Sequence, residues 1–524
     1  MKKSKVLFFI IFNLFVAESV FSQEFDSIQI DSLVNKAMTI SPSAGVAVVV
    51  VKDDKIVHMK GYGVTSINTN EKVDKNTLFA IASNSKAFTT AALAMLVDQG
   101  KLGWNDKVVK HIPEFKMYDP YVTENFNIQD LLTHRSGLGL GAGDLLFFPD
   151  GSDFGIEDVL NSFQYQKPVS AFRTQYDYDN LLYVAAGEVV ARVSGMSWTE
   201  FVETQIMKPL GMENSAGLYQ RLKNKSNVAS PHATENGKLK GLKHFTKNDE
   251  SLGAAGGIYA NVNDLSKWLF LHLNNGKYGD TLGKQLISEK NHAELWKAHT
   301  NIAFNAQPTS PYKTHFTAYG LGWELSDVDG KIKVEHTGGL PGMLSRTVLI
   351  PEMDLGIIVL TNTDSGGYGY YTISQEILES YLGIDAGDYI SMGKTRVEES
   401  ANKSDKITDA VWETVANADK NAINPADYIG IYKDNWFGKI EVFLKENQLW
   451  FKSYRSPKLK GPMQFYQANT FAIKWDYQDM NCDAFAMFTL DEDGKAQSIK
   501  MKGISPDIDF SFDFQDLNLV RVQE

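Results

Sequence analysis

The order of strand-like and helix-like segments along the chain constrains its fold most strongly. An almost continuously apolar stretch in residues 44–63 returns on itself across the turn signal Asp53-Asp54, as in a β-hairpin. Later segments have helical spacing, then strand character, then helical spacing again: 82–102, 154–165 and 183–195, then 319–362, then about 372–382. Strands at both ends with helices between them predict an α+β fold, with one antiparallel sheet flanked by helices and an all-helical region.

The 524 residues exceed the length of one ordinary domain, and the composition changes after the last of these helices. Residues 386–424 are rich in charged and small side chains, which predicts a solvated helical linker. Residues 425–524 contain short alternating segments separated by turns, which predict a small all-β sandwich or barrel. Aromatic side chains there fit either core packing or a ligand surface. Residues 23–385 are left as one larger domain.

The N-terminus has the pattern of an export signal. Three lysines precede an apolar run at 6–16, and small residues lead to a predicted cut after Ser22. Residues 1–22 are therefore predicted to be a signal peptide of a periplasmic or extracellular protein without a stable membrane span, although an uncleaved anchor remains the alternative. The single Cys482 excludes an intramolecular disulfide. A net charge of -12 argues against a nucleic-acid partner.

A Ser-x-x-Lys motif opens the 82–102 helix. The spacing places Ser83 and Lys86 on the same helical face. A serine hydroxyl needs a neighbour to take its proton, and a buried lysine in its neutral form can do so. The start of a helix also offers free backbone N–H groups for an oxyanion. A solvated pair on a helix surface is the alternative, but the preceding residues 78–82 are apolar.

Two further segments carry polar groups suited to acyl transfer. Tyr178 and Asn180 precede a helical run, where a tyrosine can relay protons and an asparagine can hold an amide. The sequence from His336 to Gly339 lies in a strand-like segment, where glycines let a substrate backbone approach. Either segment alone fits ordinary packing.

In this order and spacing, the three motifs resemble the serine β-lactamase and penicillin-binding-protein superfamily. Within it the chain is similar to the class C-related esterases, D-aminopeptidases and D,D-peptidases. The resemblance covers about residues 40–383 and includes the phrases at 130–138 and 255–259, followed by Asn263-Asp264-Leu265. The tail from Pro425 is similar to a small β domain appended to such hydrolases.

The resemblance implies a role for each motif residue. Ser83 would be the acylated nucleophile and Lys86 its general base. Tyr178 would pass the proton to the leaving group, and Asn180 would orient the substrate. The backbone N–H groups of Ser83 and Gly339 would form the oxyanion hole.

His336, Thr337 and Gly338 would also contact the substrate, but His336 stands where many relatives have lysine. A histidine is mostly neutral near pH 7, which weakens attraction to the carboxylate of β-lactams and D-Ala-D-Ala peptides. The expected reaction is therefore hydrolysis of a D-amino-acid peptide or amide, a peptidoglycan-derived peptide or a small ester. A class C-like β-lactamase, an acyltransferase to a non-water acceptor and a non-catalytic penicillin- or peptide-binding receptor are the alternatives.

Other signals suggest no further chemistry. Glycines recur at residues 137–143, as in a flexible loop beside the active site or, alternatively, a nucleotide-binding loop. His134 is expected to anchor a loop by hydrogen bonding. The ten histidines lack ligand spacing, so neither a metal nor a cofactor is expected. The expected partner is a small-molecule or short-peptide substrate, and the C-terminal domain could restrict the cleft or mediate homo-oligomerisation.

Overall fold

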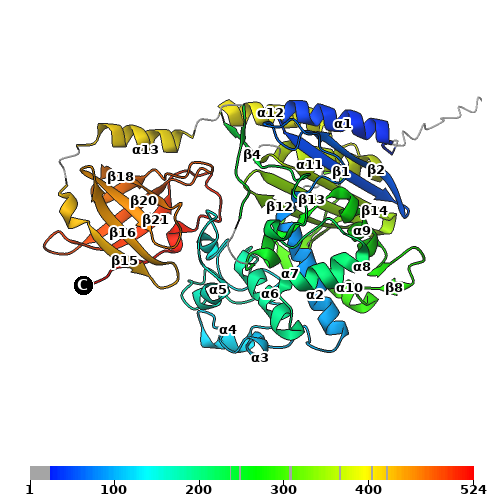
Figure 1. The fold of residues 1–524 in the computed structure, drawn as a ribbon, viewed down its shortest axis with the longest axis horizontal. Coiled ribbons are helices and arrows are strands. Elements are labelled where there is room, and N and C mark those ends of the chain that lie inside the picture. The colour runs from blue at the N-terminus through cyan, green and yellow to red at the C-terminus, as the bar shows by residue number, and fades with distance from the viewer. Residues whose placement is uncertain are drawn as a thin grey trace, which may run out of the picture.

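The computed structural model describes residues 24–235, 238–246, 250–305, 310–364, 367–402, 405–419 and 423–523. The predicted signal peptide lies outside these ranges. The described part confirms the predicted fold class, an α+β unit followed by a small all-β unit, here a closed barrel (Figure 1). Within the described part, no helix combines the length and apolar character needed to cross a membrane.

The α+β unit is built on an eight-stranded sheet in which every neighbouring pair is antiparallel. Its order is β2-β1-β14-β13-β12-β11-β10-β9, so N-terminal strands lie beside late ones, as predicted. The strands are β1 Gly45–Lys52, β2 Lys55–Gly63, β9 Thr300–Ile302, β10 Thr317–Tyr319, β11 Glu324–Val328, β12 Lys331–Leu340, β13 Met343–Ile350 and β14 Leu355–Thr361.

Thirteen helices of the described residues surround the sheet or lead to the barrel. They are α1 Ser27–Ile40, α2 Ser85–Asp98, α3 Val108–His111, α4 Pro120–Asn125, α5 Ile156–Ser162, α6 Asn180–Ser194, α7 Trp198–Phe201, α8 Lys208–Leu210, α9 Val262–Leu273, α10 Glu289–Leu295, α11 Gly367–Leu382, α12 Tyr389–Asn402 and α13 Lys406–Asn417. Short strands β3 Phe79–Ala80 and β6 Tyr259–Ala260 pair close to α2.

Strand β1 is almost continuously apolar because its two faces are both buried. Val46, Val48 and Val50 pack with α1 and α11 in one buried cluster. Ala47 and Val49 point to the opposite face, into the larger core with α2, α6 and α9. Both faces of the sheet are therefore covered by helices (Figure 1), so a strand there has no solvent side.

The C-terminal unit is a closed barrel, which leaves no unpaired sheet edge. The alternating pattern of the sequence does not predict strands β15, β18 and β22, because their runs are short or interrupted by glycine, proline and charged residues. The strands are β15 Gly430–Asp434, β16 Gly438–Lys445, β17 Gln448–Ser453, β18 Lys460–Gln467, β19 Thr470–Ile473, β20 Ala484–Leu490, β21 Ala496–Gly503 and β22 Leu519–Arg521.

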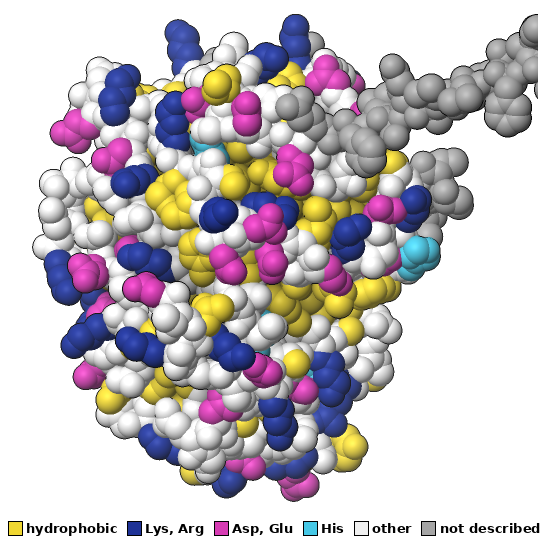
Figure 2. Space-filling view, turned by 90° about the vertical axis from the view of Figure 1, so that its right-hand side faces the viewer, with side chains coloured by type: hydrophobic (Ala, Val, Ile, Leu, Met, Phe, Trp, Pro, Cys, Tyr) yellow, Lys and Arg dark blue, Asp and Glu magenta, His cyan; other side chains and the backbone are white. Residues whose placement is uncertain are grey.

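The barrel docks against the α+β unit through ion pairs and aromatic rings. Arg455 binds Asp153 at 2.7 Å and Asp158 at 2.6 Å. Phe512 meets Phe148 edge-on with ring centres 6.4 Å apart. Figure 2 shows the face of the molecule on the right of Figure 1, on the side away from the barrel, where acidic and basic side chains are interspersed.

The ring pair Phe88–Trp268 fixes α2 to α9, and both rings are almost fully buried with centres 3.9 Å apart. Phe88→Ala is expected to lower the free energy of unfolding by about 3–5 kcal/mol, because it removes buried surface and leaves a cavity. Urea unfolding of the α+β unit measures this. Tyr121→Ala, at a ring that is 69% exposed, is the control and should change it by less than about 0.5 kcal/mol. Equal effects would contradict this packing.

Candidate active site

Ser83 sits on a tight turn that precedes the helix predicted to contain it. Residues Ala82–Asn84 form one 3-10 turn, and α2 begins only at Ser85. Ala82 has φ +47°, a conformation that is costly for a non-glycine residue. Asn84 donates to Ser345 at 2.8 Å, which ties this turn to β13. The helix ends at Asp98, earlier than predicted.

Lys86 is the second residue of α2, is fully buried and makes three polar contacts. Its Nζ is 3.1 Å from Ser83 Oγ, 2.7 Å from Asn180 Oδ1 and 2.9 Å from the Ala255 carbonyl oxygen. The ring of Tyr178 lies 4.7 Å from the same nitrogen. The predicted serine–lysine pair is therefore in hydrogen-bonding contact inside the protein, and the alternative of a solvated surface pair is wrong.

Burial changes the charge state of this lysine. Desolvation lowers the pKa of Lys86 to about 7, although Asp144 and Asp179 nearby act to raise it. The same desolvation raises the pKa of Asp144 to about 7. Near neutral pH, a large fraction of Lys86 is thus an uncharged amine.

The three contacts determine which way the neutral amine points. The Asn180 amide oxygen and the Ala255 carbonyl can only accept hydrogen bonds, so they take the two N–H groups. The nitrogen lone pair is then left facing the Ser83 hydroxyl, the one contact that can also donate. This is the geometry that a general base for Ser83 requires.

Asn180 is held at the first residue of α6. The preceding residue, Asp179, caps the helix by accepting from the amides of Leu181 and Leu182. Asn180 Nδ2 donates to Asp144 Oδ2 at 2.8 Å. Asp144 is fully buried and was not identified from the sequence; the only available signal was its position directly after the glycine-rich stretch.

Tyr178 completes the group around Ser83. Its hydroxyl interacts with the Ser83 side chain, and burial raises the pKa of the phenol well above its usual value, so it stays protonated. His134 packs on the Tyr178 ring at 4.3 Å and accepts from the Asp179 amide at 3.1 Å. His134 therefore anchors this segment by hydrogen bonding, as expected.

Strand β12 brings the His336 segment against the same turn. A Cβ atom on Gly338 would lie 2.3 Å from the Ile81 carbonyl and 3.0 Å from the Ser83 amide nitrogen, so only glycine fits. His336 uses both ring nitrogens inside the protein: Nδ1 is 2.6 Å from the Thr337 carbonyl and Nε2 is 2.8 Å from the Tyr319 hydroxyl. Burial lowers the pKa of His336 to about 4, so the ring is neutral at pH 7.

A cavity of about 360 Å³ opens at Ser83. The predicted site residues that line it are Ser83, Tyr178, Asn180, His336, Thr337, Gly338 and Gly339. Lys86 does not line the cavity, because it lies behind Ser83. Sequence reasoning missed Tyr176 and Glu324 in the lining, and burial raises the pKa of Glu324 to about 7. Both lack a motif of their own.

The barrel supplies part of the cavity wall. Met480, Asp509, Phe510 and Ser511 line it, and the Phe510 ring meets Tyr178 edge-on at 6.2 Å. The C-terminal domain is expected from the sequence to restrict the cleft or to mediate homo-oligomerisation. The structure places residues of this domain at the cleft. Within the described ranges, no three histidine, cysteine or acidic side chains converge as a metal site would require.

Comparison with known families adds to this geometry. The beta-lactamase family pattern matches residues 30–375. The chain belongs to the beta-lactamase family. Residues 417–521 match a domain of unknown function, DUF3471.

Curated relatives share about a quarter of their residues with this chain. Unguisins hydrolase ungD of Aspergillus violaceofuscus is 26% identical over 435 residues, which are 78% of this chain and 75% of the relative. Protein flp of Staphylococcus aureus is 27% identical over 344 residues, 64% of this chain and 63% of flp.

Solved structures of other proteins share the fold. An octameric penicillin-binding protein homologue from Pyrococcus abyssi superposes with a TM-score of 0.59 at 19% identity, covering 95% of this chain and all of that one (100%). A penicillin-binding protein from Bacillus halodurans superposes with a TM-score of 0.53 at 22% identity, covering 66% of this chain and 98% of its own.

The lowered pKa of Lys86 predicts how stability depends on pH. Above pH 7, Lys86 is neutral in the folded protein, whereas in the unfolded chain it stays protonated up to about pH 10. The unfolded state therefore binds more protons in this range, so the free energy of unfolding of the wild type rises with pH relative to that of Lys86→Met. The relative gain should approach about 1.4 kcal/mol per pH unit. Urea unfolding of both proteins at pH 8 and pH 9.5 measures it. A difference that stays constant would show that folded Lys86 is charged.

Proposed function

We propose that this protein is a serine hydrolase that cleaves an amide or ester through an acyl-enzyme on Ser83. The observation that carries the proposal is the buried Lys86 amine, whose two other contacts only accept and whose lone pair therefore faces Ser83 Oγ at 3.1 Å. Lys86 takes the serine proton as Ser83 attacks the substrate carbonyl. Tyr178 passes a proton to the leaving group, and water then releases the acyl group.

The backbone N–H groups of Ser83 and Gly339 are proposed as the oxyanion hole. Two observations support this: Gly338 packs directly against the Ser83 amide, and the short turn ahead of α2 keeps its first amides outside helical pairing. Asn180 and Thr337 lie on the cavity wall, where they can orient the substrate.

The cavity favours substrates without a carboxylate near the reacting bond. Within the described residues, its lining includes the carboxyl groups of Glu324 and Asp509 but no lysine or arginine. His336 is neutral and spends both ring nitrogens on internal bonds. We therefore favour a neutral or amine-bearing ester, peptide or D-amino-acid amide over a β-lactam. A relative named as a hydrolase supports hydrolysis as the reaction.

Export belongs to this proposal, because the charged and apolar pattern of residues 1–22 is that of a signal peptide.

Transfer of the acyl group to an acceptor other than water shares the first half-reaction with hydrolysis. Product analysis in the presence of amines and alcohols separates acyl transfer from hydrolysis.

An acylating probe such as a fluorophosphonate should label the wild-type protein at Ser83. Ser83→Ala should not be labelled, and Lys86→Ala and Tyr178→Phe should be labelled slower by a factor of about 10²–10⁴, because each loses a proton-transfer group. Mass spectrometry of the labelled peptide identifies the site. Equal labelling of wild type and Ser83→Ala would refute the proposal. Binding of substrates without any turnover would instead favour a receptor.

The same sample can be screened with nitrocefin, p-nitrophenyl esters and D-amino-acid amides. Turnover of an ester or amide with little turnover of nitrocefin is expected, because the described residues that line the cavity include no lysine or arginine to attract the nitrocefin carboxylate. Rapid nitrocefin turnover would contradict the preference for substrates without a carboxylate.

The pH dependence of kcat/KM for a neutral ester should follow the ionisation around Lys86. Activity requires the neutral amine, so the rate should rise with pH and level off above an apparent pKa near 7, instead of the value near 10 of an exposed lysine. Because Asp144 also titrates near 7, the apparent pKa belongs to the coupled pair. A profile that still rises at pH 9 would argue against Lys86 as the base.

A further inference from the structure

The orientation of the Asn180 amide decides where the Lys86 lone pair points. An amide presents an acceptor at one end and a donor at the other. Here the oxygen faces Lys86 at 2.7 Å because the nitrogen end donates to Asp144 Oδ2 at 2.8 Å. Turned around, Asn180 would donate to Lys86 and compete with the Ser83 hydroxyl for the lone pair. Asp144 therefore selects the orientation that leaves the base free for Ser83.

Asp144 is itself held by the barrel. Its Oδ2 also accepts from the Ser511 hydroxyl at 3.2 Å. The backbone N–H groups of the two residues flanking it donate to the carboxyl group of Asp513: Gly143 N lies 2.7 Å from Asp513 Oδ2, and Leu145 N lies 2.8 Å from Asp513 Oδ1. Asp513 is fully buried, so these two hydrogen bonds offset part of the free-energy cost of removing its carboxyl group from water.

The glycine-rich stretch explains how the barrel segment comes so close. Gly141 has φ +70°, and a Cβ atom there would lie 2.7 Å from the Phe510 ring and 2.9 Å from its carbonyl oxygen. Gly143 has φ +82°, and its Cβ would lie 2.4 Å from Leu181 of α6. These glycines therefore seat the barrel segment, and no nucleotide is needed to account for them.

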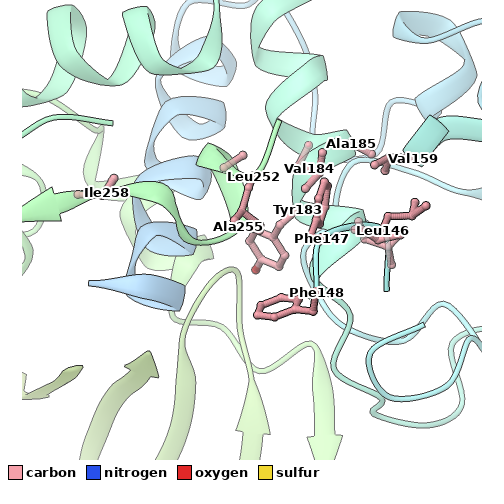
Figure 3. Packing of buried hydrophobic residues seen from close by; sticks show 14 of the residues in the cluster. Leu146, Phe147, Phe148, Val159, Tyr183, Val184, Ala185, Leu252, Ala255 and Ile258 are labelled. Atoms are coloured by element: carbon pink, nitrogen blue, oxygen red, sulfur yellow. The ribbon is translucent and has the colours of Figure 1, made fainter. Parts of the chain in front are cut away.

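On its other side, the turn is fixed by packing. Leu146, Phe147 and Phe148 belong to the same buried cluster as Tyr183 and Val184 of α6 (Figure 3). The Asp144 turn is thus clamped between α6, which carries Asn180, and barrel residues 510–513.

We propose that Asp144 is a positioning residue for the Lys86 base, acting through Asn180, and that Asp513 and Ser511 of the barrel hold Asp144 in place. In this proposal the barrel contributes to the geometry of the active site through these two residues. This inference rests on the proposed Ser83 chemistry. It assigns no contact with substrate to Asp144 or Asp513.

The test compares fluorophosphonate labelling rates and ester kcat and KM across pH 5–10 in the full-length protein. Asp513→Ala and Asp144→Ala should each label Ser83 at least about tenfold more slowly at pH 8, because the base loses its alignment. The loss should appear in kcat more than in KM. Arg455→Ala is the matched control: it removes the ion pairs to Asp153 and Asp158 at the same domain boundary and should stay within about twofold of wild type.

Asp144→Asn adds a readout that a purely structural role would not move. It keeps an oxygen to accept from Asn180, so it should recover much of the rate lost in Asp144→Ala. It also removes a negative charge near Lys86, so the acidic limb of the pH profile should move to lower pH by about half a unit or more. The other groups facing Lys86 stay the same: Asp179, His134, His336, Tyr178 and Tyr183.

Each result bears on the proposal. Wild-type labelling rates in Asp513→Ala and Asp144→Ala would overturn it, as would equal losses in Asp513→Ala and Arg455→Ala, which would reduce the contact to simple docking. An unshifted pH limb in Asp144→Asn would also count against it. If Asp513→Ala does not fold, as judged by thermal melting, Ser511→Ala and the two Asp144 variants decide. Failure of the wild type itself to label at Ser83 would refute the proposed function instead.

Discussion

A fully buried lysine with three polar neighbours is the constraint on which the rest of this structure depends. An ammonium group without solvent costs several kcal/mol, and the protein meets that cost by letting Lys86 lose its proton near pH 7. The amine then needs acceptors for its N–H groups and a donor for its lone pair. Asn180, the Ala255 carbonyl and Ser83 meet these needs one by one, so the arrangement that stabilises the fold is also the one that activates the serine.

Carboxyl groups near the lysine raise its pKa, against the larger lowering by burial, and do not form a direct hydrogen bond with it. Asp144 reaches Lys86 only through the Asn180 amide, and Asp179 spends one oxygen on the first amides of α6. A direct ion pair would hold the lysine protonated and unable to act as a base. The intervening amide of Asn180 separates the two groups and fixes their geometry through a hydrogen bond to each.

Much of the fold and the residues around Ser83 could be predicted from local patterns. The hairpin 44–63 has a strong turn signal, and Asp53 and Asp54 do adopt positive φ. Ser83, Lys86, Tyr178 and Asn180 stand in short motifs, and the structure brings them together.

What the sequence concealed depends on contacts between distant segments. Glu324 and Asp144 have no motif, and their importance comes from burial that only the folded chain creates. Asp513 had one weak signal, a lone carboxylate among the aromatic residues of the segment Phe510–Phe514. Such a residue is costly in a core unless it has partners, but the partners lie in the other domain. Its role could not be read from either domain alone.

The placement of Asp513 has a consequence for biogenesis. Ser83 is made early and Asp513 much later, so a growing chain carries Ser83 before it carries the barrel residues that line the cleft. During synthesis the α+β unit can fold first, as N-terminal domains generally do, and the contacts of Asp144 with Ser511 and Asp513 can form only after the barrel segment has been made. If Asp513 holds Asp144 as proposed, the site around Ser83 is complete only when both domains have folded.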